Sequence, residues 1–193
     1  MAEIADRRTD YKIEIKDKMM MKKMLMAALM LLSAVGVKAQ TAVVDEDVQY
    51  ATELLKIGTV APTFSLKQPD GTIFHSTSLK GKIVVLDFWA SWCPDCRKDL
   101  PRVVKLWNEY KDCVAFVGIS FDTDKTNWEN AIKKYGLGYI NVSELKKMRE
   151  SAIAKAYGVH WIPSTYILDK DGKVVLGTVM IDKLEKTLRE LCK

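Results

Sequence analysis

The chain has 193 residues; 48% are hydrophobic, 30 are Lys or Arg and 25 are Asp or Glu, which gives a formal net charge of +5. This length suffices for one domain with a hydrophobic core plus extra sequence at one end. Residues 1–39 hold eight basic and five acidic residues, so the remainder carries only +2. Without a basic stripe and interleaved aromatic side chains, the sequence predicts no nucleic-acid partner.

The first 39 residues have the pattern of an N-terminal extension plus a signal peptide. Residues 1–18 are polar and mixed in charge, and they precede Met19–Lys23, which offers a more natural start and a basic region. Residues 24–37 are an apolar run, shorter than the ~20 residues needed to cross a bilayer. Small or aliphatic residues then lead to Ala39. We therefore predict cleavage after Ala39 and export to the periplasm or an equivalent space, with a membrane anchor by an uncleaved signal as the alternative.

The rest of the chain divides into a lead-in over residues 40–56 and a single domain over residues 57–193. The lead-in is acidic and ends in Tyr50–Lys56, for which we predict a short helix. No internal repeat or low-complexity segment interrupts the domain.

The domain begins with a predicted β-hairpin. Residues 63–66 and 72–75 alternate apolar and polar side chains on either side of Pro69-Asp70-Gly71, a turn sequence. Ile83–Trp89 is a continuous apolar run with β-branched and aromatic residues, interrupted by one aspartate, which predicts a buried central strand.

Helices and strands then alternate. Apolar residues at helical spacing predict a helix over Pro94–Tyr110. The apolar sequence of residues 113–121 predicts a second buried strand. A short helix around Trp128–Ile132 should end at Gly136, and a longer helix is predicted over Ser143–Tyr157.

The C-terminal part predicts a second hairpin and a final helix. Residues 165–168 and 173–180 flank the turn Asp169–Gly172, and residues 181–192 have an amphipathic helical pattern. The order of elements is a βαβ unit followed by a ββα unit, so the fold class is α/β.

The most informative motif is Cys93-Pro94-Asp95-Cys96, at the point where the buried strand gives way to a helix. Pro94 suits the first helical position, which places Cys93 at the helix N-terminus, where free N–H groups and the helix dipole favour a thiolate. Cys93 is therefore the predicted attacking thiol, and Cys96 resolves the mixed disulfide. Asp95 opposes thiolate formation at Cys93, which favours an electron donor over an oxidant.

Two further carboxylates are candidates. Asp87 interrupts the apolar strand, and burial would raise its pKa towards neutrality, so that it could accept the proton of Cys96. The alternative is an edge-strand aspartate paired with Lys82. Asp99 lies one turn beyond Cys96 and either tunes the thiols or is an ordinary solvated carboxylate.

A CxxC motif has two other common uses, in zinc sites and in structural disulfides. A zinc site needs two more ligands in a compact group, and Cys113, Cys192, His75 and His160 are scattered along the chain, so no metal is expected. A fixed disulfide over so short a loop constrains few residues, so we favour a redox role.

The segment Asp87–Cys96 resembles the thioredoxin active-site segment. Ala61-Pro62-x-Phe64, Gly81-Lys82, Asp99-Leu100-Pro101 and Ile162-Pro163-Ser164-Thr165 are similar to segments of the exported thioredoxin-like reductases of the TlpA/ResA type. The similarity runs from about Ile57 to Cys192. At Asp99 the chain departs from the glutamate common in that group.

The resemblance implies a thioredoxin fold with the N-terminal β-hairpin and an inserted helix and strand around residues 122–141. It also implies a cis Pro163 beside the thiols, with the backbone of Ile162 bonding an extended substrate segment. Trp92 is expected to line the docking surface. In this topology Cys113 and Cys192 are expected on the face of the sheet opposite the active site, where they are either bridged or two unpaired thiols.

We therefore predict a monomeric thiol-disulfide oxidoreductase that requires no cofactor. The resemblance implies reduction of protein disulfides in a client, in cytochrome c maturation for example, with electrons from a membrane thiol carrier. A peroxiredoxin-like enzyme and a non-enzymatic docking domain are the alternatives.

Overall fold

The computed structural model describes residues 18–24 and 44–193, which belong to two separate units. Residues 18–24 are helical and exposed. Most of the apolar run and the predicted cleavage site after Ala39 lie outside the described residues. Among the helices that the structure describes, none has both the length and the apolar composition needed to span a bilayer.

In the second unit, Val44–Lys193, seven strands form one mixed sheet in the order β2-β1-β5-β4-β3-β6-β7. Strands β3, β4 and β5 are parallel, β6 and β7 extend the sheet antiparallel on one side, and the β1–β2 hairpin joins antiparallel on the other. The strands are β1 (Ser65–Lys67), β2 (Ile73–His75), β3 (Ile83–Trp89), β4 (Val114–Ser120), β5 (Ile140–Ser143), β6 (Ser164–Leu168) and β7 (Val174–Thr178).

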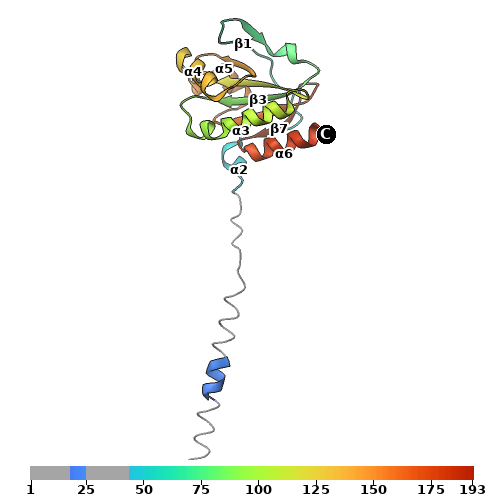
Figure 1. Cartoon of the computed structure of the whole chain (residues 1–193). Helices are drawn as coiled ribbons and strands as arrows, with labels where there is room; N and C mark the ends of the chain where they lie inside the picture. The colour runs from blue at the N-terminus through green and yellow to red at the C-terminus, as the bar shows by residue number, and fades with distance from the viewer. Residues whose placement is uncertain (1–17, 25–43) are drawn as a thin grey trace, which may run out of the picture. The chain divides into compact units, whose positions relative to one another are not determined.

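Helices cover both faces of this sheet. Helix α3 contacts α4 and α6, and Figure 1 shows α3 and α6 side by side along the sheet. Tyr157 of α5 instead packs on Phe88, whose side chain points to the face opposite Asp87 because side chains alternate along a strand. The helices are α2 (Asp47–Tyr50), α3 (Pro94–Tyr110), α4 (Lys125–Tyr135), α5 (Ala152–Tyr157) and α6 (Ile181–Leu191), with 3-10 turns η1 (Ser76–Leu79) and η2 (Met148–Glu150).

This arrangement is a thioredoxin fold, and it confirms the predicted N-terminal hairpin and the inserted helix and strand, which are α4 and β5. The buried strands β3 and β4 lie at the centre, as their continuous apolar sequences predicted. Gly136 ends α4 with φ of 66°, a left-handed conformation that glycine adopts without steric cost.

The predicted helix over Ser143–Tyr157 is wrong. Ser143 ends β5, and Leu145 has φ of 53°, which a continuing right-handed helix cannot accommodate. Helix α5 starts only after Ser151, whose hydroxyl accepts a hydrogen bond from the N–H of Ala154 (3.1 Å) and donates one to Glu144 (2.5 Å). Ser151 is an N-cap signal that the periodicity of apolar residues obscured.

The described part of the lead-in packs against the domain, which the sequence did not predict. Its helical turn is Asp47–Tyr50, so the predicted helix over Tyr50–Lys56 is wrong. The carboxylate of Asp47 accepts hydrogen bonds from Thr178 Oγ1 (2.8 Å), the N–H of Val179 (2.7 Å) and Lys183 Nζ (2.6 Å). These contacts attach the segment to the end of β7 and the start of α6.

Cys113 and Cys192 form a disulfide, with Cα atoms 6.0 Å apart. Cys113 precedes β4, and Cys192 follows α6. The bridge lies at the end of the sheet opposite Cys93, because β3 and β4 are parallel and Cys93 follows the end of β3. Of the two alternatives, the bridged state is the one found.

We predict that replacing both cysteines, Cys113→Ser with Cys192→Ser, lowers the free energy of unfolding by about 2–4 kcal/mol, because the bridge closes a long loop in the unfolded chain. Urea unfolding without reductant measures this. The oxidoreductase activity expected from the sequence should be unchanged, since the bridge is remote from Cys93. An unchanged unfolding midpoint would show that the bridge does not support the fold.

Candidate active site

The candidate site forms where β3 ends and α3 begins. Cys93 is the N-cap of α3, with extended backbone angles, and its Sγ accepts a hydrogen bond from the N–H of Cys96 (3.1 Å). Pro94 occupies the first helical position, as predicted. The preceding turn is held by Asp122, which accepts hydrogen bonds from the hydroxyl (2.5 Å) and the N–H (3.0 Å) of Ser91. The turn thus presents Cys93 in a fixed position.

The two cysteines are bonded to each other, with Cα atoms 5.3 Å apart, so the site is in its oxidised form. The Ile162–Pro163 peptide bond is cis, as the resemblance implied, and the carbonyl oxygen of Ile162 lies 3.6 Å from Sγ of Cys93. Both cysteines are buried, with Cys93 3% and Cys96 1% exposed. The loop containing Ile162 and Pro163 therefore packs directly on the disulfide.

Asp87 lies on the face of β3 that α3 covers. It is buried on a central strand, so it is not the edge-strand aspartate of the alternative interpretation. Burial raises the pKa of Asp87 to about 7, and the negative charge of Asp99 acts in the same direction, while Tyr139 lowers it. Near neutral pH this carboxyl group can both accept and release a proton.

Asp99 and Asp95 differ in their surroundings. Asp99 is partly buried on α3, and this burial raises its pKa. Its charge reaches Asp87, so it influences the site through that residue. Asp95 is exposed in the first turn of α3, where a carboxylate is favourable for the helix.

A cavity of about 10 Å³ lies beneath the start of α3, with room for about one water molecule. Its walls include Asp87, Cys96, Asp99, Pro163 and Thr165. The cavity therefore connects the buried carboxyl group with the second cysteine and with Asp99.

Aromatic side chains flank the opening of the site. Trp92 is 56% exposed next to Cys93, and Trp161, just before the cis-proline loop, is 39% exposed. Tyr50 of the lead-in stacks on Trp161, with ring centroids 4.2 Å apart. Trp89 and Tyr157 are buried in the core and do not reach this surface.

Sequence reasoning missed three residues near Asp87. Tyr139, just before β5, approaches the Asp87 carboxyl group from the inserted element, and Asn141 lies beside it. Gly118 separates them from Asp87 in the sheet. A glycine within a buried strand was the available signal, since it often marks a close approach by another group.

Within the described ranges, no three His, Cys, Asp or Glu side chains gather into a group that could hold a metal ion. The chemical groups that the site offers are two thiols and titratable carboxyl groups.

The sequence matches one protein family and several curated thiol-disulfide oxidoreductases. The AhpC/TSA family matches residues 57–176. The thiol-disulfide oxidoreductase ResA of Bacillus thuringiensis is 33% identical over 145 residues, which cover 72% of this chain and 80% of ResA.

Solved structures also match. A thiol-disulfide oxidoreductase from Bacteroides fragilis is 32% identical with a TM-score of 0.65, covering 69% of this chain and 99% of that protein. A secreted Mycobacterium tuberculosis disulfide oxidoreductase, described as homologous to Escherichia coli DsbE, is 27% identical with a TM-score of 0.58. That match covers 66% of this chain and 96% of the mycobacterial one.

We predict that Asp87→Asn stabilises the protein at alkaline pH. The folded state keeps the Asp87 proton up to a pKa of about 7, whereas the unfolded chain releases it near 4. Wild-type stability should therefore fall between pH 4 and 7, in total by up to about 4 kcal/mol, and the variant should lack this fall. Urea unfolding at pH 4 and pH 8 measures the difference.

The exposed Asp95→Asn is the matched control and should show no such gain. If Asp87→Asn is no more stable than the wild type at pH 8, Asp87 is not a carboxyl group held against ionisation.

Proposed function

The chain belongs to the AhpC/TSA family and is a thiol-disulfide oxidoreductase of the TlpA/ResA type, and we propose that it reduces protein disulfides outside the cytoplasm. The observation that carries this proposal is the Cys93–Cys96 pair at the N-terminus of α3, with Cys96 and the buried Asp87 lining one small cavity. The proposed order of events starts from the dithiol form.

In the first step the thiolate of Cys93 attacks one sulfur of the substrate disulfide. A bond forms between Cys93 Sγ and that sulfur, the substrate disulfide breaks, and the other substrate sulfur leaves as a thiolate. The N–H of Cys96, which already points at Cys93 Sγ, and the N-terminus of α3 support the negative charge on Cys93.

In the second step Cys96 resolves the mixed disulfide. The thiol of Cys96 gives its proton to the carboxylate of Asp87, and its sulfur then attacks Cys93 Sγ. The Cys93–Cys96 disulfide forms, and the second substrate sulfur leaves as a thiolate. Two electrons have passed from the enzyme to the substrate. The pKa of Asp87, about 7, suits it to accept the proton and later return it.

The substrate segment should bind beside the thiols in an extended form. We assign its docking to Trp92, the backbone of Ile162 and the cis Pro163, which lie next to Cys93. Pro94, Asp95 and Asp99 tune the thiols and the proton acceptor. Each of these assignments rests on position and burial around the pair.

The cellular setting follows from the proposed export. With residues 1–39 as an extension and signal peptide, 40–56 as a lead-in and 57–193 as the domain, the protein works as a monomer in the periplasm. A CxxC pair there is oxidised unless it is fed electrons, so a membrane thiol carrier is the proposed donor. By analogy with the family, a cytochrome c awaiting haem attachment is a candidate client.

A potentiometric test decides the direction of electron flow. We expect a Cys93/Cys96 reduction potential of about −200 to −270 mV, in the range of reducing members of the fold, measured against glutathione or dithiothreitol buffers. A value near that of strong oxidants, about −120 mV, contradicts a reductase role.

The roles of the two cysteines have a separate test. Cys96→Ser should stop insulin reduction and accumulate a mixed disulfide through Cys93, because the resolving thiol is gone, while Cys93→Ser should form no such adduct. Non-reducing electrophoresis and mass spectrometry measure both. Rapid peroxide turnover by Cys96→Ser would point to a peroxiredoxin instead, and full function in Cys93→Ser would indicate a docking domain.

A further inference from the structure

Four buried polar atoms meet on the face of the sheet that carries Asp87. Asp87 Oδ2, Trp89 Nε1, Tyr139 OH and Asn141 Oδ1 are all buried, and none has a hydrogen-bond partner of normal geometry among the residues that the structure describes. Unpaired buried polar atoms are costly and uncommon. Two possible donors and two possible acceptors therefore lie in one buried region of the sheet.

The sheet register explains how these residues meet. Asp87 of β3 pairs with Gly118 of β4, and Gly118 pairs with Asn141 of β5, so all three lie on one face. A methyl group on Gly118 would lie 2.9 Å from Tyr139 Cε2, 2.9 Å from Asn141 Oδ1 and 3.1 Å from Trp89 Nε1. Only a glycine in β4 leaves room for Tyr139 to reach across that strand towards Asp87.

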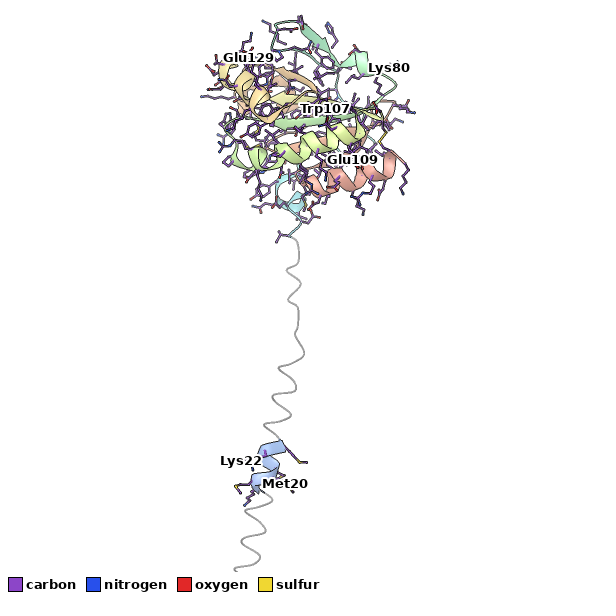
Figure 2. The ribbon with its side chains drawn as sticks, viewed as in Figure 1. Met20, Lys22, Lys80, Trp107, Glu109 and Glu129 are labelled. Carbon is purple, nitrogen blue, oxygen red and sulfur yellow. A yellow bond between two sulfur atoms is a disulfide. The ribbon has the colours of Figure 1, made fainter. Side chains whose placement is uncertain are left out.

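The surroundings fix the position of Tyr139. The amide nitrogen of Asn141 donates to the carbonyl of Tyr139 (2.7 Å) and to that of Leu137 (2.9 Å). The Tyr139 ring packs edge-on against Trp107, labelled on α3 in Figure 2, with centroids 5.8 Å apart. Phe116 contacts the same ring at 6.1 Å. The ring is thus held by packing and its backbone by Asn141, which leaves the hydroxyl directed at the cluster.

Tyr139 and Asp87 affect each other's pKa. Tyr139 lowers the pKa of Asp87, while burial first, and then the charge of Asp87, raise the pKa of Tyr139 well above its usual value. The hydroxyl therefore stays protonated and can act only as a donor towards an ionised Asp87. The other titratable groups facing Asp87 are Cys96 and Asp99 of α3; β4 contributes Gly118 and β6 contributes Thr165.

From this geometry we propose that Tyr139 is a positioning residue whose hydroxyl donates a hydrogen bond to the carboxylate of Asp87 and so sets the pH at which Asp87 takes the proton of Cys96. The inference deepens the proposed function and depends on Asp87 as the proton acceptor.

The test is the pH profile of single-turnover disulfide reduction by the dithiol form of Tyr139→Phe. The ring contacts remain and only the donor is lost, so the acidic limb should move up by about 0.5–1 pH unit. The rate at pH 6 should then fall about three- to tenfold, while the rate at pH 9 should change less than about twofold. Tyr157→Phe is the matched control, because Tyr157 is also buried but its hydroxyl donates to the carbonyl of Pro62 (2.6 Å).

An equal loss of rate at every pH, or an unmoved profile, overturns the proposal. Asp87→Asn separates the two hypotheses. If that variant keeps the wild-type acidic limb, Asp87 is not the proton acceptor and the proposed mechanism fails. If Asp87→Asn loses the acidic limb of the pH profile and Tyr139→Phe leaves that limb unshifted, only the proposed role of Tyr139 fails.

A measurement on the unmodified protein avoids the risk that a variant misfolds. The ¹³Cζ resonance of Tyr139 in the dithiol form should change with pH and with a midpoint near that of Asp87, about 7. The Tyr157 resonance should not. A Tyr139 signal that is flat between pH 5 and 9 contradicts the hydrogen bond.

Discussion

A carboxyl group buried at the centre of the sheet is the constraint on which the site depends. Asp87 is only 3% exposed, and removing its charge from water costs free energy that apolar packing alone would not impose. The protein accommodates it by raising the pKa to about 7 rather than by pairing it with a cation. The same burial gives Asp87 a proton affinity suited to exchange with a thiol. Burying this carboxyl group therefore lowers the stability of the fold but makes the group able to accept a proton near neutral pH.

The elements around Asp87 each contribute one part of the redox site. Helix α3 places Cys93 at its N-terminus and Cys96 above the carboxyl group, while the loop before β6 brings the cis Pro163 against the disulfide. The inserted strand β5 brings Tyr139 across Gly118 to the far side of Asp87. A buried acid thus has the thiol on one side and a hydroxyl on the other.

Much of this arrangement could be predicted from local patterns. The apolar run of β3, the turn residues of both hairpins and the glycine that ends α4 each specify their structure through short-range sterics and burial. The prediction failed over Ser143–Tyr157, where apolar spacing suggested one helix, but Leu145 breaks the backbone and Ser151 starts α5. It also missed the attachment of Asp47 to Thr178 and Lys183, because side chains 131 and 136 residues away complete those bonds.

The sequence by itself determined the pair Cys93 and Cys96, the helix N-terminus that holds it and the aspartate in the strand before it, because neighbours in the chain supply all three. Only the tertiary structure decided that Cys113 and Cys192 are bridged, that Ile162 lies against Cys93 and that Tyr139 faces Asp87. Those contacts join residues from different strands, and strand order and register, which no local pattern contains, bring them together.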